Sequence, residues 1–318
     1  MLILSEQQVR ERLDLDESVA VLEKMFRRDY AGTVQMPLRT QMQTFSDLTC
    51  LVMPCSDSAL PGAGVKLVTV RHGAHFNGDR VQADCFLLEQ ASGKVCAVVA
   101  ANYLTEIRTA AVSAIATKFL ARPDAQTLGI FGTGRQALAH ILLLSRDQRF
   151  ERFVVCGSHP SRSKDFAGWV ALNHDLHIEP VDAATCAAEA DVLCTCTTSK
   201  TPIFDGKFVR EGTHLNLVGG FQPESREVDD LVVGRARIVV DSYEGALAEA
   251  GDLLIPLGLG SITKEHIIAD LHQIVSGEVE GRRSARDITV FKSVGFALED
   301  LVIATLVYQS VKAGEVHP

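Results

Sequence analysis

The chain has 318 residues, of which 47% are apolar and 22% are charged, and 40 acidic against 31 basic side chains give a net charge of −9. This composition is typical of a soluble globular protein of two domains and excludes a disordered chain, which could not bury enough apolar surface to offset its ordering entropy. The acidic balance argues against nucleic acid as a partner, because a protein that follows a phosphate backbone needs a basic face.

The first third of the chain is predicted to contain short helices followed by antiparallel strands. Ser5 is a typical helix N-cap, and residues 16–30 carry apolar side chains at helical spacing. Between residues 34 and 99 the pattern changes to short apolar runs separated by turn signals such as Pro61-Gly62 and Asn77-Gly78-Asp79. This change of pattern predicts an antiparallel sheet.

A helix rich in Ala, Ser and Thr is predicted for residues 102–120, and Arg122-Pro123-Asp124 then marks a domain boundary. After this boundary, strands alternate with helices of ten or more residues, which predicts a parallel sheet with right-handed crossovers. A last helix, expected over residues 293–312, returns to the first domain. The expected strands are 127–131, 153–156, 177–180, 192–195, 214–218 and 238–240.

The strongest local motif is Gly132-Thr133-Gly134-Arg135-Gln136-Ala137, which follows an apolar strand and precedes a helix. It matches G-x-G-x-x-A in the context that a dinucleotide needs. The first glycine allows the tight turn, the second lets backbone amides reach the pyrophosphate at the helix N-terminus, and Ala137 lets the helix pack closely on the strand. The motif predicts a dinucleotide-binding domain with a doubly wound parallel sheet of the Rossmann type.

The second strand of this domain favours NADP(H) over NAD(H). NAD sites usually end this strand with an acid that binds the ribose hydroxyls. Here the strand runs into Gly157-Ser158-His159-Pro160-Ser161-Arg162, which contains no acid. A 2′-phosphate would meet Ser158 and Arg162 without repulsion, although Arg162 could equally be a solvated residue at a helix start.

No apolar stretch reaches the roughly 18 residues of a membrane span, and the N-terminus lacks the features of a secretory signal. The eight cysteines are scattered among apolar neighbours, and Cys194 and Cys196 have the wrong spacing for a metal or redox pair. Reduced thiols in a cytoplasmic protein without a metal site are therefore expected. His72 and His75 resemble a metal pair, but nothing nearby in the sequence completes a site.

Three segments together carry a resemblance to a known family. They are Arg108-Thr109-Ala110-Ala111-Val112-Ser113-Ala114, the glycine motif after residue 131, and Ser293-Val294-Gly295-Phe296-Ala297-Leu298-Glu299-Asp300. In this order they resemble the ornithine cyclodeaminase/mu-crystallin family over essentially the whole chain. The resemblance implies a homodimer that acts on carbon–nitrogen bonds of small amino acids with a nicotinamide cofactor. It also implies an α+β substrate-binding and dimerisation domain, residues 1–122 plus 293–318, and a Rossmann domain, residues 123–292.

The family's site positions carry over to this sequence as expectations. Its carboxylate-binding residues match Arg39, Lys66 and Arg108, of which a bidentate Arg would fix the plane of a carboxylate while Lys acts as a point charge. His214, at the start of a strand, is expected next to the cofactor. The positions expected at the cofactor are Thr109, Arg135, Gln136, Thr197, Leu215 to Val218, and Ser293 with Val294 near the nicotinamide.

Two departures from the family pattern decide between reactions. Ornithine cyclodeaminases carry an Asp after the Gly-Gly where this chain has Phe221, and a Glu where it has Leu51. Neither apolar side chain can hold or deprotonate a cationic diamine. The preferred hypothesis is therefore NAD(P)H-dependent reduction of a small cyclic ketimine carboxylate, of the pyrroline-2-carboxylate or piperideine-2-carboxylate type, in amino-acid metabolism.

In this hypothesis Lys66 and Arg108 are the catalytic residues, with Lys66 helping to protonate the imine. Met53 and Phe221 would line the ring, and Ser293 and Val294 would complete the substrate site. An ornithine cyclodeaminase or an alanine-type dehydrogenase stays open as an alternative, and it would need a replacement acid. The nearest such acids in sequence are Glu227, Asp229 and Glu249. A non-catalytic, cofactor-binding protein like mu-crystallin is the second alternative.

Overall fold

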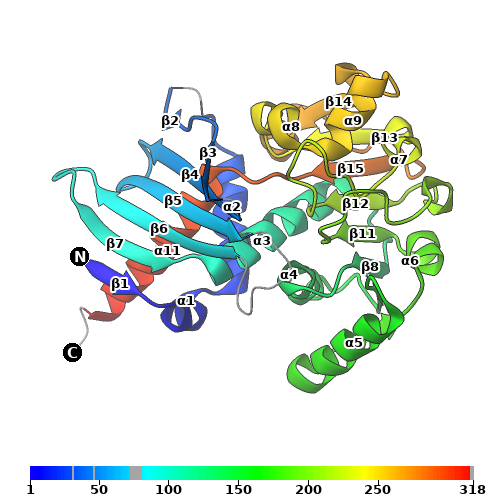
Figure 1. The fold of residues 1–318 in the computed structure, drawn as a ribbon, viewed down its shortest axis with the longest axis horizontal. Coiled ribbons are helices and arrows are strands. Elements are labelled where there is room, and N and C mark those ends of the chain that lie inside the picture. Colours follow the sequence, from blue (N-terminus) through cyan, green and yellow to red (C-terminus); the bar gives the residue numbers. More distant parts are fainter. Residues whose placement is uncertain (31, 46, 72–80, 316–318) are drawn as a thin grey trace. The chain divides into compact units, whose positions relative to one another are not determined.

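The computed structural model describes residues 1–30, 32–45, 47–71 and 81–315, and its contacts divide the chain into two units (Figure 1). Unit 1 comprises residues 1–108 and 296–318, and unit 2 comprises residues 109–295. The sequence predicts boundaries at 122/123 and 292/293. The first boundary instead falls inside helix α3 (Asn102–Leu120), whose last turns belong to unit 2, where Thr117 Oγ1 accepts a 2.9 Å hydrogen bond from Asn216. Residues 72–80, with the two histidines and the turn expected there, lie outside the described residues.

Unit 1 is built on a seven-stranded sheet in the order β1-β7-β6-β5-β4-β2, with β3 also paired to β4. All pairings are antiparallel except that of β1 with β7, which confirms the antiparallel sheet predicted for this region. The strands are β1 (Leu2–Leu4), β2 (Val34–Gln35), β3 (Thr40–Phe45), β4 (Leu48–Asp57), β5 (Gly62–Arg71), β6 (Val81–Glu89) and β7 (Val95–Ala100).

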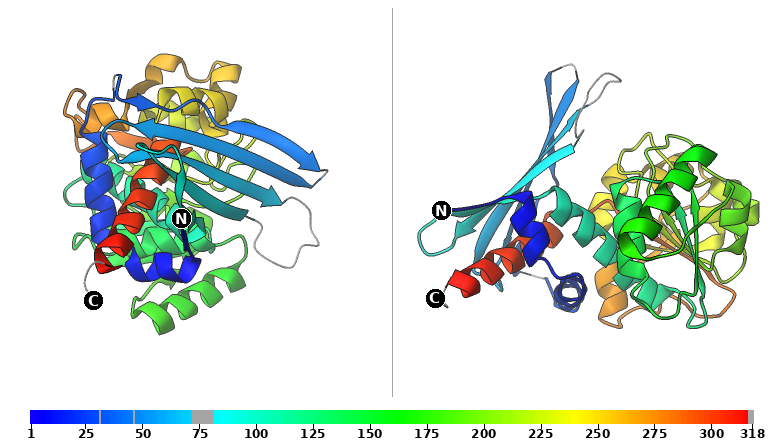
Figure 2. Two further views of the ribbon diagram at one scale, coloured as in Figure 1. Left: turned by 90° about the vertical axis from the view of Figure 1, so that its left-hand side faces the viewer. Right: turned by 90° about the horizontal axis from the view of Figure 1, so that it is seen from below.

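Helices cover one face of this sheet (Figure 2). They are α1 (Glu6–Arg12), α2 (Leu15–Phe26) and α11 (Ala297–Glu315), and α11 packs across β4 to β7. Ser5 caps α1 as predicted, because its hydroxyl accepts a hydrogen bond from the backbone of Gln8. Helix α11 begins four residues later than predicted, because the preceding segment is tied to Asp241 in unit 2 and Gly295 has φ +76°.

The strands of unit 1 alternate between the two faces of the sheet. In β4, Leu51, Met53 and Cys55 are buried on the face that the helices cover, while the residues between them are only half-buried. In β5, Lys66 points to the same covered face, paired in register with Met53. The two-residue period of the strand therefore places a lysine inside the apolar interior of unit 1.

Unit 2 is an eight-stranded sheet in the order β10-β9-β8-β11-β12-β15-β13-β14, and every pairing in it is parallel. Each of the six predicted strands is present within two residues of its expected bounds, whereas β14 and β15 are additional. The strands are β8 (Thr127–Phe131), β9 (Arg152–Cys156), β10 (Glu179–Pro180), β11 (Val192–Thr195), β12 (His214–Leu217), β13 (Ala236–Val240), β14 (Ile267–Asp270) and β15 (Ile288–Lys292).

Helices flank both faces of this sheet, and a separate apolar core lies on each side of it. The order of the strands reverses between β8 and β11, which is the point where doubly wound sheets bind ligands outside the carboxyl ends of their strands. Unit 2 is therefore a Rossmann-type domain, as predicted. Its helices are α4 (Arg135–Leu144), α5 (Pro160–His174), α6 (Ala183–Glu189), α7 (Asp230–Arg235), α8 (Tyr243–Glu249), α9 (Gly251–Leu259) and α10 (Leu271–Val275), with 3-10 turns η1 (Gly206–Phe208) and η2 (Lys264–His266).

All eight cysteines are described, and all are free thiols. Burial raises the pKa of Cys85 and Cys194 to about 12, so these thiols stay protonated and unreactive near neutral pH. Among the described residues, no three His, Cys, Asp or Glu side chains lie close enough together to hold a metal ion. No helix in the described part of the chain is both long and apolar enough to cross a membrane.

Candidate functional site

The glycine motif forms the turn between β8 and α4. Gly132 has φ +115°, and a Cβ there would lie 2.5 Å from the carbonyl oxygen of Cys196, so only glycine fits this turn. Gly134 is the N-cap of α4 without a side-chain cap, and a Cβ there would meet nothing within 4 Å. The N-terminus of α4 thus has no side-chain cap and no acid in its first turn, which fits the pyrophosphate of a dinucleotide.

The end of β9 is the place that separates NAD from NADP in such domains. A Cβ on Gly157 would lie 2.9 Å from the methyl group of Thr133, so this strand end adjoins the glycine motif. Ser158 and Arg162 are both exposed, and His159 caps α5 through its ring nitrogen. Hydrogen-bond donors for a 2′-phosphate are therefore available in Ser158 and Arg162, but the preference for NADP stays a prediction.

A buried carboxylate, which the sequence offered only as a possible replacement acid, joins the carboxyl ends of β11 and β12. Glu227 Oε2 accepts hydrogen bonds from Thr195 Oγ1 at 2.6 Å and from Gly219 N at 2.8 Å. Its Oε1 accepts from both the backbone N and the Oγ1 of Thr197 at 2.7 Å. Burial raises the pKa of Glu227, and Asp252 raises it further. Because both oxygens are occupied, Glu227 is not free to act as a base.

A second buried acid supports the first. Asp252 Oδ1 accepts from the backbone N of Glu227 at 2.6 Å, and its Oδ2 lies 3.0 Å from Lys292 Nζ at the end of β15. All three side chains are fully buried. The loop around residue 227 is thereby fixed to the ends of three adjacent parallel strands. Asp229, the second candidate acid, caps α7 and accepts from Gly206 N, so its carboxylate has a structural task.

The segment after β15 is held by Asp241. Its Oδ2 accepts hydrogen bonds from the backbone of Val294 and Gly295, both at 2.6 Å, and from Ser293 Oγ at 3.1 Å. Ser293 and Val294, predicted near the nicotinamide, are buried at 3% and 8% exposure. Sequence reasoning missed Asp241, Asp252 and Lys292, because nothing in the local pattern shows that distant residues meet.

Two predicted cofactor neighbours take other places in the structure. Leu215 is fully buried in the middle of β12 and belongs to the apolar core, so among residues 215–218 it is Val218 that lies beyond the strand end. His214 is the first residue of β12 and thus lies at the amino edge of the sheet, whereas ligands bind at the carboxyl edge. This position does not support the expectation that His214 adjoins the cofactor, which stays a prediction.

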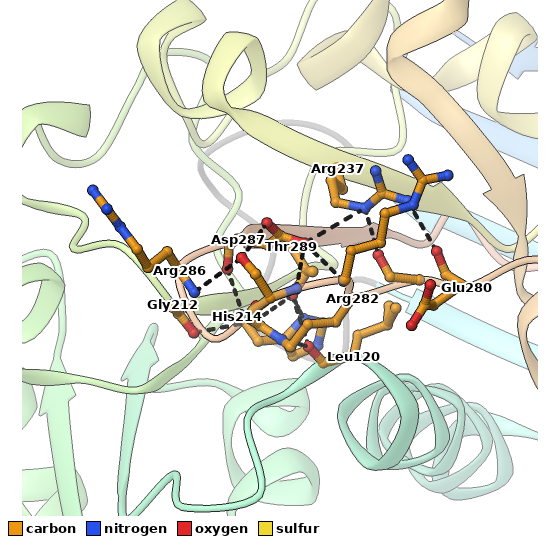
Figure 3. A network of polar contacts seen from close by, with 12 residues as sticks. Leu120, Gly212, His214, Arg237, Glu280, Arg282, Arg286, Asp287 and Thr289 are labelled. Carbon is orange, nitrogen blue, oxygen red and sulfur yellow. Dashed lines mark hydrogen bonds and ion pairs between the residues drawn. The ribbon is translucent and has the colours of Figure 1, made fainter.

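Figure 3 shows the network that holds His214. Its ring nitrogens lie 3.0 Å from Thr289 Oγ1 and 3.2 Å from Asn216 Oδ1, and burial lowers its pKa to about 3. Arg282 donates to the carbonyl oxygens of Leu120 and Gly212 and to Thr289 Oγ1. This cluster ties the end of α3 to the starts of β12 and β15, and its role is structural.

In unit 1, two of the three predicted carboxylate-binding cations meet in the interior. Lys66 Nζ donates to Asp300 Oδ1 at 2.8 Å, and Arg108 Nε lies 3.1 Å from the same oxygen. Arg108 Nη1 donates to Glu299 Oε2 at 2.5 Å. Burial lowers the pKa of Lys66, while Asp300 acts in the opposite direction. Glu299 and Asp300, which the sequence shows only as part of the family motif, neutralise both cations, and no local pattern predicts this pairing.

The remaining predicted residues have different surroundings. Met53 is 4% exposed and pairs with Lys66 across the β4–β5 ladder, so it adjoins the cation cluster. Arg39 is partly exposed just before β3, and Thr109 is buried in α3. Phe221 is 39% exposed on the loop after β12. Arg135 is exposed and Gln136 partly buried at the start of α4.

One cavity of unit 1 lies away from these residues. It has a volume of about 560 Å³ and lies between β5 to β7 and the outer turns of α11. Leu88, Cys96, Tyr308 and Lys312 are among its lining residues, and none of the predicted site residues borders it.

The glycine turn, the parallel sheet and its buried strand-end acids define unit 2 as a dinucleotide-binding domain, attached to an α+β unit with two buried, ion-paired cations. Residues 1–315 match the ornithine cyclodeaminase/mu-crystallin family, and the chain belongs to this family.

Relatives that are named as reductases cover nearly the whole chain. The Delta(1)-pyrroline-2-carboxylate reductase of Bacillus cereus is 34% identical over 316 residues, covering 97% of this chain and 96% of the relative. The ketimine reductase mu-crystallin of Rattus norvegicus is 36% identical over 292 residues, with coverage of 91% and 90%. The structure of Thermococcus litoralis Delta(1)-pyrroline-2-carboxylate reductase in complex with NADH and L-proline superposes with a TM-score of 0.94 at 33% identity and 99% coverage of both chains.

Proposed function

We propose that this protein reduces a small cyclic ketimine carboxylate, of the pyrroline-2-carboxylate or piperideine-2-carboxylate type, to the cyclic amino acid with NAD(P)H. It is an oxidoreductase that acts on C=N bonds in amino-acid metabolism. The observation that carries the proposal is the buried pair Lys66 and Arg108, held together by Asp300. The B. cereus and R. norvegicus relatives, named as reductases of this kind, support it.

Lys66 and Arg108 bind and orient the substrate carboxylate in this proposal. Arg108 is fixed by Glu299 and Asp300, so its guanidinium is oriented before substrate arrives. A bound nicotinamide supplies the hydride that adds to the imine carbon. A proton on the ring nitrogen completes the conversion of C=N to CH–NH, and burial, which lowers the pKa of Lys66, makes its ammonium a better donor of that proton. Orientation of the carboxylate contributes much of the rate.

Deamination of a diamine receives less support from the described residues. Leu51 is buried and apolar, and Phe221 cannot accept a proton. Glu227 and Asp229 already accept hydrogen bonds from backbone amides. A cationic side chain of ornithine would thus lack the acids that a cyclodeaminase uses at these positions.

Absorbance of NAD(P)H at 340 nm tests the proposal directly. Purified protein should oxidise NADPH or NADH with pyrroline-2-carboxylate, and it should give no proline and no ammonia from ornithine. Proline and ammonia from ornithine would refute the proposal in favour of a cyclodeaminase, and NAD reduction with alanine would favour a dehydrogenase. Cofactor binding without turnover of any imine or amino acid would favour a binding protein like mu-crystallin.

We further propose that NADPH is preferred over NADH. Ser158 and Arg162 are exposed at the end of β9, where the sequence has no acid to repel a 2′-phosphate. Arg162→Ala should weaken NADPH binding by about tenfold, as expected for one charge-assisted phosphate contact, and leave NADH binding unchanged. Fluorescence titration with both cofactors measures this, and equal effects on the two would contradict the assignment.

A cytoplasmic homodimer is the assembly that we propose. The face of the unit 1 sheet opposite α11 carries half-buried apolar side chains, among them Val52, Val65, Leu67, Phe86 and Val98. Such a continuous apolar sheet face is typical of a subunit interface. Leu67→Lys should shift the mass in light scattering from dimer to monomer. A wild-type protein that is monomeric at micromolar concentration would refute the dimer. The cytoplasmic location is supported by the eight free thiols, which are typical of a reducing compartment.

A further inference from the structure

We propose that Glu227 is a positioning residue, which aligns the two loops at the carboxyl ends of β11 and β12 so that they bind the nicotinamide half of the cofactor. The inference rests on the proposed function in one respect, because it takes the strand ends of unit 2 as the place where the cofactor binds. It adds a residue that makes no contact with substrate or cofactor and acts through Thr197 and Gly219.

The four hydrogen bonds to Glu227 come from two separate loops. The amide and hydroxyl of Thr197 belong to the segment after β11, and the amide of Gly219 belongs to the segment after β12. Thr195 adds the fourth donor from the last residue of β11. One carboxylate therefore links the segments after β11 and β12, in addition to the backbone hydrogen bonds that Val218 and Gly219 donate to Thr195.

Glycine at position 219 shows how closely these loops approach. A Cβ there would lie 2.0 Å from the carbonyl oxygen of Thr197 and 2.5 Å from Glu227 Oε1. At Gly220, a Cβ would lie 2.7 Å from Asp252 Oδ2. The Gly-Gly pair is thus needed because the chain passes directly over the two buried carboxylates. Small displacements of either acid must move this backbone.

Glu227 itself cannot move independently of the sheet. Its backbone amide donates to Asp252, and Asp252 is paired with Lys292 at the end of β15. The side chains of Glu227, Asp252 and Lys292 are all fully buried. A buried carboxylate with four donors on its oxygens gains rigidity from a network in a low-dielectric interior, where each hydrogen bond is strong.

Thr197 and Val218 are the predicted cofactor neighbours at these strand ends, and Thr197 is half-buried with its hydroxyl turned to Glu227. Val218 N and Gly219 N also donate to the carbonyl oxygen of Thr195, at 3.0 and 3.2 Å. The edge that receives the nicotinamide is therefore built on hydrogen bonds that converge on Thr195 and Glu227. Loss of the carboxylate should alter where the ring is held rather than the chemistry of hydride transfer.

Glu227→Gln tests the inference with almost no change in shape. Whichever way the new amide is turned, its NH2 group faces a backbone N–H, that of Thr197 at one end or that of Gly219 at the other. One loop must therefore move. We expect the Kd of NAD(P)H, measured by fluorescence titration without substrate, to rise about 10-fold to 100-fold, as for other supporting residues of binding sites.

Asp191→Asn is the matched control at the opposite edge of the same sheet. Asp191 Oδ2 accepts from the backbone amides of Gln126 and Thr127, so it joins the starts of β8 and β11 as Glu227 joins the ends of β11 and β12. Both variants should lower the melting temperature, whereas Glu227→Gln alone should weaken cofactor binding. If Glu227→Gln does not fold, Thr195→Val removes one of the four donors and should weaken cofactor binding in the same direction.

Unchanged cofactor affinity in folded Glu227→Gln, or an equal loss in Asp191→Asn, would overturn the inference and leave Glu227 a structural residue. Steady-state kinetics with a ketimine supplies a second readout, in which KM for NAD(P)H should rise more than KM for the ketimine. A wild-type protein that binds cofactor but reduces no ketimine would refute the proposed function only, because the titration without substrate still tests Glu227.

Discussion

Replacement of Asp300 by Asn tests the cation cluster of unit 1 most directly. The change keeps the size of the side chain, and the amide oxygen still accepts a hydrogen bond from Lys66, but the carboxylate charge is lost. In the wild-type protein, Lys66 and Arg108 are balanced by Glu299 and Asp300, and each of these four side chains is at most 7% exposed. Among these four side chains, Asp300→Asn therefore leaves two positive charges against one negative charge.

The size of the effect follows from this uncompensated charge. Removal of one member of a buried ion pair costs about 3–5 kcal/mol, and the remaining hydrogen bond to Lys66 places Asp300→Asn near 3 kcal/mol. For a chain of this length that unfolds cooperatively, this loss lowers Tm by roughly 5 °C. A carboxylate ligand replaces the missing charge, so pyrrole-2-carboxylate should raise Tm more in the variant than in the wild type.

The loss of stability in Asp300→Asn should also depend on pH in a defined direction. Burial already lowers the pKa of Lys66 below its ordinary value of 10.5, and the loss of Asp300, which opposes this shift, lowers it further. The unfolded chain then binds more protons than the folded chain between the folded pKa and 10.5, so stability rises with pH across that window. The deficit is complete at pH values below the folded pKa of Lys66, and it shrinks as the pH rises from there toward 10.5.

Urea unfolding at pH 7, 8 and 9, together with thermal melts in pyrrole-2-carboxylate, measures these effects. Asp57→Asn is the control, because Asp57 pairs in the same unit with Arg28, whose side chain is 28% exposed. Asp57→Asn should lose less stability than Asp300→Asn, and pyrrole-2-carboxylate should raise its Tm no more than it raises that of the wild type. The reasoning is refuted if Asp300→Asn matches the wild type in stability, or if the ligand stabilises both variants equally.

Three further predictions concern unit 2. Gly132→Ala forces φ +115° on a residue with a side chain and places its Cβ 2.5 Å from the carbonyl oxygen of Cys196. The variant should therefore lose about 1–3 kcal/mol of stability. It should also fail to bind NAD(P)H in a titration, with circular dichroism to show that the protein is folded. His214 is neutral when folded, with a pKa of about 3, and must be protonated on unfolding below pH 6.5, so it should cost the wild type about 2 kcal/mol at pH 5. Between pH 7.5 and pH 5, the free energy of unfolding should fall less in His214→Asn than in the wild type. Arg282→Leu, which leaves the buried carbonyl oxygens of Leu120 and Gly212 without their donor, should lower stability by at least about 2 kcal/mol and leave the Kd of NAD(P)H unchanged.

The fold was predictable wherever the chain signals its structure locally. The glycine turn, the strand before it and the helix after it are specified within about twenty residues, and the structure has them at the predicted places. Strand β15, residues 288–292, was not among the strands expected from the sequence. Its insertion between β12 and β13 is a property of the sheet order, which no local pattern reveals.

The candidate site was predictable in its residue types but not in its pairings. Lys66 and Arg108 were identified through the family resemblance. Their partners are distant in the sequence, because Asp300 lies 234 positions from Lys66 and Glu299 lies 191 positions from Arg108. Glu227 was noted only as a nearby acid. Its hydrogen bonds to Thr197 and Gly219 depend on the parallel pairing of β11 with β12, so a local reading could not tell a free base from a buried support.

The pairing of the two cations with two acids determines which net charge of substrate the cluster best accepts. Three unpaired cations around one carboxylate would favour any anion, but Lys66 and Arg108 with Glu299 and Asp300 form a cluster of zero net charge. Such a cluster best accepts a molecule that is itself neutral overall, because no excess charge is then buried. A protonated cyclic ketimine carboxylate is a neutral zwitterion, whereas ornithine carries one further positive charge. The apolar residues Leu51 and Phe221 supply no acid for that charge, so the charge balance of unit 1 and the two departures in sequence favour the same substrate class.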